Sequence, residues 1–245
     1  MRAKLPPLLL FTAIVAAWQG ICWAGWVSPF LMPSPDEVLQ VLWQDHEELA
    51  YAALLTGVGS VGGFLLSVIS GIGLALALSG SDWAYRAVYP YAVLFQTVPI
   101  IAVAPLLVIW LGYGLPTVIA SAFLASVFPV IMASLTGIAS ASPELRDLFR
   151  LYRASRRDTL LKLILPMALP SLLTGLRFAA GLAVIGTIVG EFVGGGGLGN
   201  VIDIARTLQR VDKVFAAVFL ASLLGALAIA LIDMVSRWSL KAWEP

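Results

Sequence analysis

Two long stretches of this sequence carry no charged residue: one runs from Leu49 to Ser81 and the other from Ala87 to Pro143. A charged side chain at the centre of a bilayer costs about 2.5–3.5 kcal/mol, so such stretches are typical of membrane-spanning helices. The composition agrees, because 60% of the 245 residues are hydrophobic and only 12% are charged. The sequence therefore predicts a membrane protein with no room for a soluble catalytic domain.

Hydrophobic stretches of about 20 residues predict six membrane-spanning helices. The uncharged stretch 87–143 is too long for one span, and the turn-forming residues 111–116 divide it into two. The predicted fold is all-α, with a single transmembrane domain over residues 1–245. The helices are expected at about 8–27, 54–78, 88–111, 116–138, 168–190 and 214–235.

Two predicted connections, 28–53 and 139–166, are longer than a hairpin requires. The second is rich in Arg, whereas the first holds acidic residues and neither Lys nor Arg. Basic residues are enriched in cytoplasmic loops of membrane proteins. This rule places loop 139–166 and both termini in the cytoplasm and loop 28–53 outside.

Few residues have side chains suited to catalysis or metal binding, and this scarcity excludes several classes of protein. A single cysteine, Cys22, and a single histidine, His46, provide neither a disulfide framework nor a Cys/His metal site, and we expect no metal and no catalytic residues. A net charge of +1 offers no basic excess for nucleic acid. The chain contains no Gly-Lys pair and hence no phosphate-binding loop of the G-x-x-x-x-G-K-[ST] type. Any ATP used must bind to another subunit.

Four residues are candidates to line a pathway through the membrane. Pro99 and Pro105 remove backbone donors from the predicted third helix, and such irregularity is tolerated where protein or a water-filled cavity supplies partners. Gln96 is one turn away and would either line that cavity or bond to a neighbouring helix. Trp110 could stack on a planar solute, or it could serve packing alone. Glu191 either belongs to the pathway or its outer gate, or is a solvated helix end.

The inner loop is predicted to hold two short helices. Ser142-Pro143-Glu144 combines a capping hydroxyl, a proline at the first helical position and an acid in the first turn. Apolar residues then recur at three- and four-residue spacing: Leu145, Leu148, Phe149 and Tyr152. A second capping pattern begins at Ser155, and its helix should end near Pro166. This amphipathic segment is expected either to lie on the membrane surface or to bind a cytoplasmic partner.

The same loop carries a motif, Asp147-Leu148-Phe149, then Arg153, then Leu163-Ile164-Leu165-Pro166. It resembles the Glu-Ala-Ala, Gly, Ile-x-Leu-Pro pattern of permease subunits of bacterial binding-protein-dependent ABC importers, with the spacing kept. Three departures are Asp for Glu, Leu-Phe for Ala-Ala and Arg153 for Gly. If the turn needs a left-handed residue there, Arg costs about 1 kcal/mol relative to Gly.

Other segments extend the resemblance over most of the chain, including Gln96-Thr97-Val98-Pro99, 110–114 and Gly190-Glu191-Phe192. They are similar to permeases that import nitrate, sulfonates, taurine, thiamine pyrimidine precursors or riboflavin. The segment 96–114 is most similar to the thiamine-precursor and riboflavin branch.

The resemblance implies a permease of type I importer fold in the bacterial inner membrane. Its partners would be a second permease copy, two cytoplasmic ATPase subunits that bind ATP-Mg, and an extracytoplasmic solute-binding protein; this chain would hold no cofactor. Coupling to the ATPase is expected at Asp147, Leu148, Phe149, Arg150, Arg153, Ala154 and Pro166. Two alternatives stay open: an ion-coupled secondary carrier, and a membrane scaffold that transports nothing. A secondary carrier would need ionisable residues along its path through the membrane, whereas the few in this sequence lie near the ends of the predicted helices.

Overall fold

The structure, a computed structural model, describes residues 5–28, 30–78 and 82–241. Every regular element within these ranges is a helix, and eleven are α-helices. They are α1 (Leu5–Trp23), α2 (Pro35–Gln44), α3 (His46–Leu78), α4 (Asp82–Gln96), α5 (Ile100–Leu111), α6 (Leu115–Ala139), α7 (Pro143–Leu151), α8 (Arg156–Thr159), α9 (Leu165–Gly194), α10 (Gly197–Thr207) and α11 (Val211–Lys241). A π-helical turn, Leu160–Ile164, joins α8 to α9.

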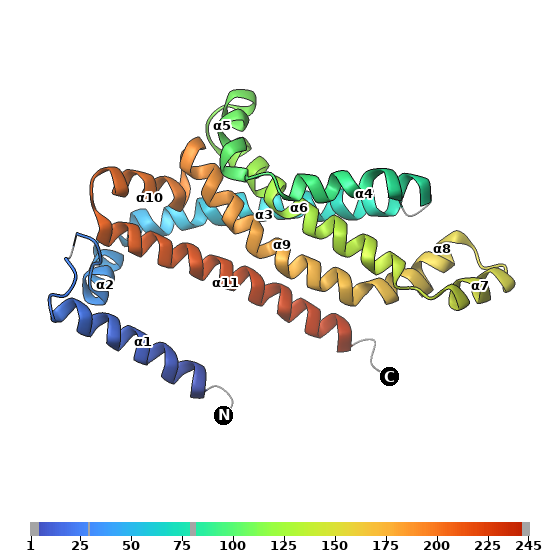
Figure 1. Cartoon of the computed structure of the whole chain (residues 1–245), viewed down its shortest axis with the longest axis horizontal. Helices are drawn as coiled ribbons and strands as arrows, with labels where there is room; N and C mark the ends of the chain where they lie inside the picture. Colours follow the sequence, from blue (N-terminus) through green and yellow to red (C-terminus); the bar gives the residue numbers. More distant parts are fainter. Residues whose placement is uncertain (1–4, 29, 79–81, 242–245) are drawn as a thin grey trace.

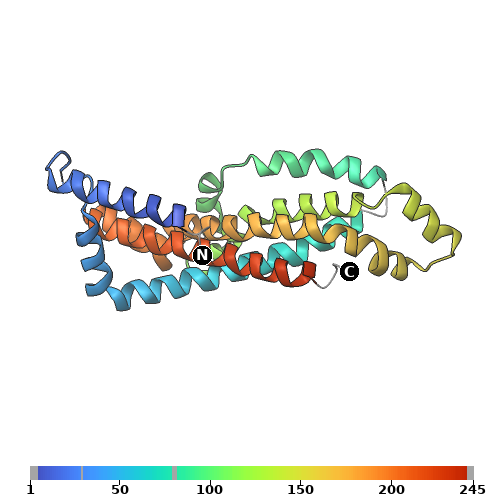
Figure 2. The same cartoon turned by 90° about the horizontal axis from the view of Figure 1, so that it is seen from below.

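The centre of the molecule is formed by α3, α6 and α9, which lie side by side along its longest axis (Figures 1 and 2). Small residues bring their backbones together, as is usual in membranes, where close packing takes the place of the hydrophobic effect between helices. A Cβ added at Gly63 of α3 would lie 2.8 Å from the backbone nitrogen of Phe123 in α6. One added at Gly186 of α9 would lie 2.7 Å from the carbonyl oxygen of Ser121. These contacts fix the three helices at minimal separation.

Among the described residues, four helical segments are long and apolar enough to cross a membrane: 46–78, 115–139, 156–194 and 211–239. A bent pair, 86–96 with 100–111, supplies a fifth, and the apolar part of α1 is shorter, Leu9–Trp23. The helix expected at 88–111, with irregular backbone at its prolines, is thus divided into α4 and α5. The chain turns by 98° between α4 and α5.

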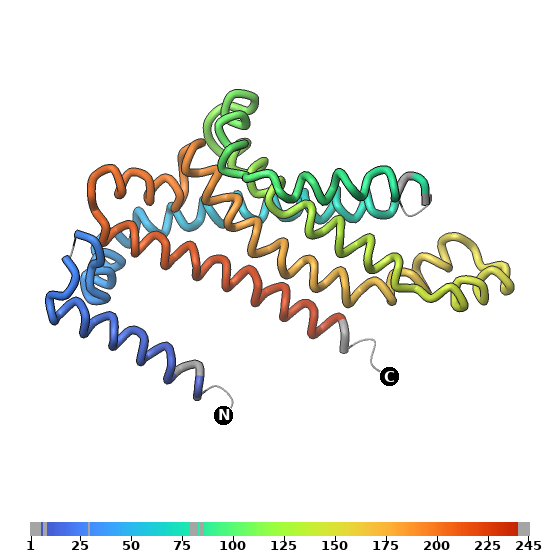
Figure 3. Tube along the Cα trace, viewed as in Figure 1, coloured from blue at the N-terminus to red at the C-terminus, as the bar shows by residue number. Residues whose placement is uncertain are grey.

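The bend between α4 and α5 lies at Pro99, whereas Pro105 stays inside α5. Pro99 is the N-cap of α5, with φ −69° and ψ 113°. The carbonyl of Phe95, whose usual helical donor Pro99 lacks, accepts a hydrogen bond of 3.2 Å from the backbone N–H of Val98. α4 thus ends in a tight turn, and α5 runs transverse to the central helices and projects to one side of them (Figures 1 and 3).

The outer segment 28–53 is more ordered than a loop. Ser34 and Glu37 form a capping box at the start of α2, and α3 begins at His46 instead of about residue 54. Lys213 of α11 pairs with Asp45 at 3.0 Å and with Glu48 at 2.7 Å. These ion pairs hold the corner between α2 and α3 against α11.

The inner segment also differs from its prediction. The helix that begins at Arg156 does not end near Pro166 but continues through the π-helical turn into α9 as far as Gly194. The backbone N–H of Leu165 donates to the carbonyl of Leu160, five residues back. Helical turns of this width are often found at functional sites. A continuous helical path therefore joins the inner loop to the opposite end of the molecule.

Candidate functional site

The α7–α8 hairpin projects from one end of the molecule, beyond the central helices (Figures 1 and 2). At its start, the Ser142 hydroxyl accepts a hydrogen bond of 3.3 Å from the backbone N–H of Leu145. Hydrogen bonds from its own backbone N–H and from Ser142 lower the pKa of Glu144. The negative charge of Glu144 lies near the positive, N-terminal end of the α7 dipole, and this favourable interaction stabilises the helix.

The turn after α7 is a Schellman motif with Arg153 in its left-handed position. The backbone N–H of Arg153 donates to Arg150 and that of Ala154 to Phe149, both at 2.9 Å. Arg153 has φ +50°, a conformation that glycine adopts without cost. The condition that the sequence left open is therefore met, because the turn does place a left-handed residue at this position.

We expect Arg153→Gly to slow amide exchange in the hairpin by about fivefold, because about 1 kcal/mol of left-handed strain is removed. Gln209, with φ +59°, occupies the same position after α10, and Gln209→Gly should act likewise there. Arg150→Gly, within α7, should instead speed exchange. Hydrogen exchange with mass spectrometry measures all three; faster exchange in Arg153→Gly would show that the arginine side chain stabilises the turn.

One face of the hairpin exposes apolar side chains, and we call Leu148, Leu151 and Tyr152 the docking face. Leu151 is 82% exposed and Tyr152 is 80% exposed. Exposed apolar groups gathered on one short element are typical of an interaction surface. Phe149 is half-buried, whereas Asp147 and Arg150 form an exposed ion pair of 3.1 Å.

The hairpin is fixed firmly to the central helices. The Arg146 guanidinium donates a hydrogen bond of 2.6 Å to the carbonyl of Ile138 near the end of α6. The Ser140 hydroxyl donates to the carbonyl of Met167 in α9 at 3.0 Å. A Cβ added at Gly137 would lie 2.9 Å from Ala168, so α6 and α9 touch here. The base of the hairpin is therefore joined to both α6 and α9.

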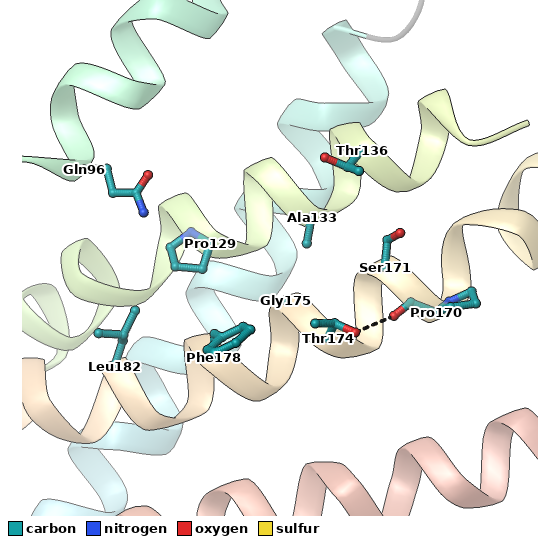
Figure 4. A pocket seen from close by; sticks show the side chains of 10 residues that line it. All are labelled: Gln96, Pro129, Ala133, Thr136, Pro170, Ser171, Thr174, Gly175, Phe178 and Leu182. Atoms are coloured by element: carbon teal, nitrogen blue, oxygen red, sulfur yellow. Dashed lines mark hydrogen bonds between the residues drawn. The ribbon is translucent and has the colours of Figure 1, made fainter.

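A cavity of about 600 Å³ lies between α4, α6 and α9 (Figure 4). Ten residues line it, and none is charged: Gln96, Pro129, Ala133, Thr136, Pro170, Ser171, Thr174, Gly175, Phe178 and Leu182. Gln96 from α4 faces Phe178 and Leu182 of α9 across it, and the Thr174 hydroxyl donates to the carbonyl of Pro170 at 2.9 Å. The cavity thus combines hydrogen-bonding groups with one aromatic face.

The structure separates the four predicted pathway residues. Gln96 lines the cavity, and Pro99 forms the adjacent bend. Trp110 is 69% exposed near the far end of α5 and belongs to no cavity wall described above. Glu191 lies near the other end of α9, lines a smaller pocket with the glycines 194–197, and is only 1% exposed. The alternative of a solvated helix end for Glu191 was wrong.

Comparison with known proteins gives the context for this geometry. The family described as "Binding-protein-dependent transport system inner membrane component" matches residues 63–241, a range that includes the docking face and the whole cavity. The chain belongs to this family. It is thus the transmembrane permease component of an ABC importer and a multi-pass inner-membrane protein, and in such systems the ATPase is a separate subunit.

Three relatives of this permease match it over nearly the full length. The formylaminopyrimidine transport permease protein ThiX of Halalkalibacterium halodurans is 36% identical, covering 95% of this chain and 94% of the relative. The riboflavin transport system permease protein RibX of Chloroflexus aurantiacus is 32% identical, with 97% and 89% covered. A putative aliphatic sulfonates transport permease, SsuC of Bacillus subtilis, is 30% identical, with 96% and 86% covered. The family group named from the sequence is confirmed.

The fold matches a solved structure described as an inward-facing conformation of the MetNI methionine ABC transporter. The TM-score is 0.64 at 20% identity, with 81% of this chain and 97% of that chain covered. The expected type I importer fold is confirmed.

Sequence reasoning missed part of both sites in this permease. Leu151 was not among the expected coupling residues, although it follows Leu148 by three positions. Ser171, Thr174 and Phe178 recur at three- and four-residue spacing along α9, which puts them on one helix face. That spacing was available in the sequence, but only the positions of α4 and α6 show which face lines a cavity.

Proposed function

We propose that this permease works as a homodimer and imports a small, uncharged, planar solute at the expense of ATP hydrolysed by two cytoplasmic ATPase subunits. The observation that carries the proposal is the pairing of an exposed docking face with a polar cavity, joined by the continuous helix 156–194. An extracytoplasmic binding protein would deliver the solute. ATP would bind only to the partner subunits, and this chain would need no cofactor of its own.

The homodimer is supported by the surface of α5. This helix projects to one side of the central helices after the 98° bend, and it leaves Ile101, Ile109 and Trp110 largely exposed. Irregular backbone such as the bend at Pro99 is tolerated at membrane depth where protein or a water-filled cavity covers it. We infer that a second copy covers α5, so that the two cavities face a shared pathway containing Gln96, Pro99 and Trp110.

The orientation follows from the positions of the basic residues. The α7–α8 hairpin carries Arg150, Arg153, Arg156 and Arg157 at one end, and the acidic residues of α2 and the start of α3 lie at the other. By the positive-inside rule, the hairpin and both termini lie in the cytoplasm. Coupling to the ATPase then uses the docking face, with Asp147, Phe149, Arg150, Arg153, Ala154 and Pro166 shaping or supporting it.

The chemistry of the cavity supports an uncharged solute. Transfer of an unpaired charge out of water is expensive, so an anion such as nitrate or a sulfonate needs positive groups in its path. Arg177 is adjacent to the cavity in sequence but pairs with Asp233 of α11 at 3.3 Å. The amide, hydroxyl and phenyl groups of Gln96, Thr174 and Phe178 instead suit a planar heterocycle, which they would bind by hydrogen bonds and stacking. A pyrimidine of the kind named for the ThiX relative fits best.

We expect cells producing the complete importer to take up labelled formylaminopyrimidine, and Phe178→Ala to reduce that uptake about three- to tenfold, because one stacking contact contributes about 0.5–1.5 kcal/mol. The matched control is Phe219→Ala in α11, where the ring is similarly exposed but lines no described cavity. Labelled taurine, nitrate and riboflavin are assayed in parallel. Uptake of an anion in preference to the pyrimidine would contradict the assignment of an uncharged solute. Uptake of riboflavin in preference to the pyrimidine would instead show that the planar solute is a flavin.

A further inference from the structure

Among the described residues, Glu191 is the only charged residue whose side chain is buried. It lies in the last turn of α9, and its carboxylate is held by two other helices. The Thr56 hydroxyl of α3 donates to Oε1 at 2.8 Å, and the backbone N–H of Gly199 in α10 donates to Oε2 at 2.8 Å. A buried carboxylate is costly at membrane depth, so its retention calls for a specific role.

These contacts supply the N-terminal cap that α10 lacks. Its own N-cap residue, Gly196, has no side chain to accept from the first amides of the helix. The backbone N–H of Leu198 donates to the Thr56 hydroxyl at 2.9 Å, and that of Gly199 donates to Glu191. A carboxylate also suits the positive end of the helix dipole. The start of α10 is therefore capped by side chains of α3 and α9 instead of its own.

Gly197 and Gly199 leave no room for a side chain beside the carboxylate. A Cβ added at Gly199 would lie 2.5 Å from the carbonyl oxygen of Ile188 and 2.7 Å from Cβ of Glu191. One added at Gly197 would overlap the carboxylate itself. Gly195, Gly196 and Gly197 have φ of +79°, +84° and +61°, which lets the chain reverse sharply after α9. The turn thus presses α10 directly against Glu191.

The same α9 helix begins, through α8 and the π-helical turn, at the cytoplasmic hairpin. Its opposite end carries α10, which lies beside α3 and α11 at the outer end of the molecule (Figure 1). We propose that Glu191 is a positioning residue that fixes α10 to α9 and α3, so that α10 and the hairpin move as one body. Contact with a loaded binding protein at the outer end is thereby transmitted to the ATPase. This role rests on the proposed function.

The test compares ATP hydrolysis by the complete complex in liposomes, with and without its loaded binding protein. Glu191→Gln removes the negative charge beside the start of α10 and leaves one acceptor oxygen where the carboxylate has two, so the stimulation by binding protein should fall about tenfold while basal hydrolysis and co-purification stay within about twofold. Thr56→Val should behave the same way and Thr56→Ser should not, because serine keeps the hydroxyl. Ser60→Ala is the matched control, since it removes a buried α3–α9 hydrogen bond of 2.9 Å to Thr187 without touching α10.

Amide exchange of Leu198 and Gly199 gives a second measurement that needs no partner. We expect it to rise about tenfold in Glu191→Gln and to stay unchanged in Ser60→Ala. Unchanged exchange or unchanged stimulation in Glu191→Gln would overturn the proposal, and so would an equal loss of basal and stimulated hydrolysis. A wild-type complex with no stimulated hydrolysis, but with the expected exchange, would instead contradict the proposed function.

Discussion

Replacing both Leu151 and Tyr152 with Asp should prevent the permease from retaining its ATPase partner. Both side chains are about four-fifths exposed in the free chain, so their loss should leave its own fold intact. In a complex they would lie at the centre of the contact, where a buried anchor typically contributes 2 kcal/mol or more. Two such losses weaken binding by about a thousandfold. Affinity purification of the tagged permease followed by quantitative mass spectrometry measures the retained ATPase.

The control for this double substitution is Trp43→Asp, which alters an equally exposed aromatic residue of α2 at the outer end. It should leave the amount of co-purified ATPase unchanged. If the double variant retained all of its ATPase, the docking face would have to contact something else, such as the lipid headgroups. A wild-type chain that recovers no ATPase, even after cross-linking, would contradict binding of the ATPase to the docking face.

The membrane-spanning segments were predictable because the bilayer imposes a rule that depends on sequence alone. Charge is excluded from its core whatever the neighbouring helices do, so the uncharged stretches between Leu49 and Pro143 mark spans directly. The bend between α4 and α5 was not predictable in this way. Pro90, Pro99 and Pro105 all remove a backbone donor, yet only Pro99 lies at a break. Thr97, whose hydroxyl donates to Leu94, closes the preceding turn.

The two candidate sites differ in how far local sequence determines them. The turn at Arg153 was predictable because a Schellman motif involves only a few consecutive residues and depends on one left-handed position. The cavity was not, since its walls come from three helices and only Gln96 carried a signal. Glu191 was ambiguous for the same reason: a carboxylate at a helix end is solvated or buried according to whether another element covers it. Here α10 covers it, and the glycines 194–197 were the available indication.

The central packing of α3 against α6 gives the second large expected effect. Gly63→Ala should destabilise the permease by about 3 kcal/mol, because overpacking of a tight contact costs about 1–3 kcal/mol and here the obstacle is backbone. The added Cβ would lie 2.8 Å from the Phe123 nitrogen and 2.9 Å from the carbonyl carbon of Ala122. Neither atom can move without displacing α6. Thermal unfolding in detergent, followed by tryptophan fluorescence, measures the loss.

Gly73→Ala is the matched substitution, because it adds the same methyl group to the same helix where no atom lies within 4 Å. It should stabilise the permease by about 0.5–1 kcal/mol, since alanine loses less backbone freedom than glycine on forming a helix. The two variants therefore shift the unfolding temperature in opposite directions. If Gly63→Ala also raised it, α3 and α6 would have to lie farther apart than their small residues require.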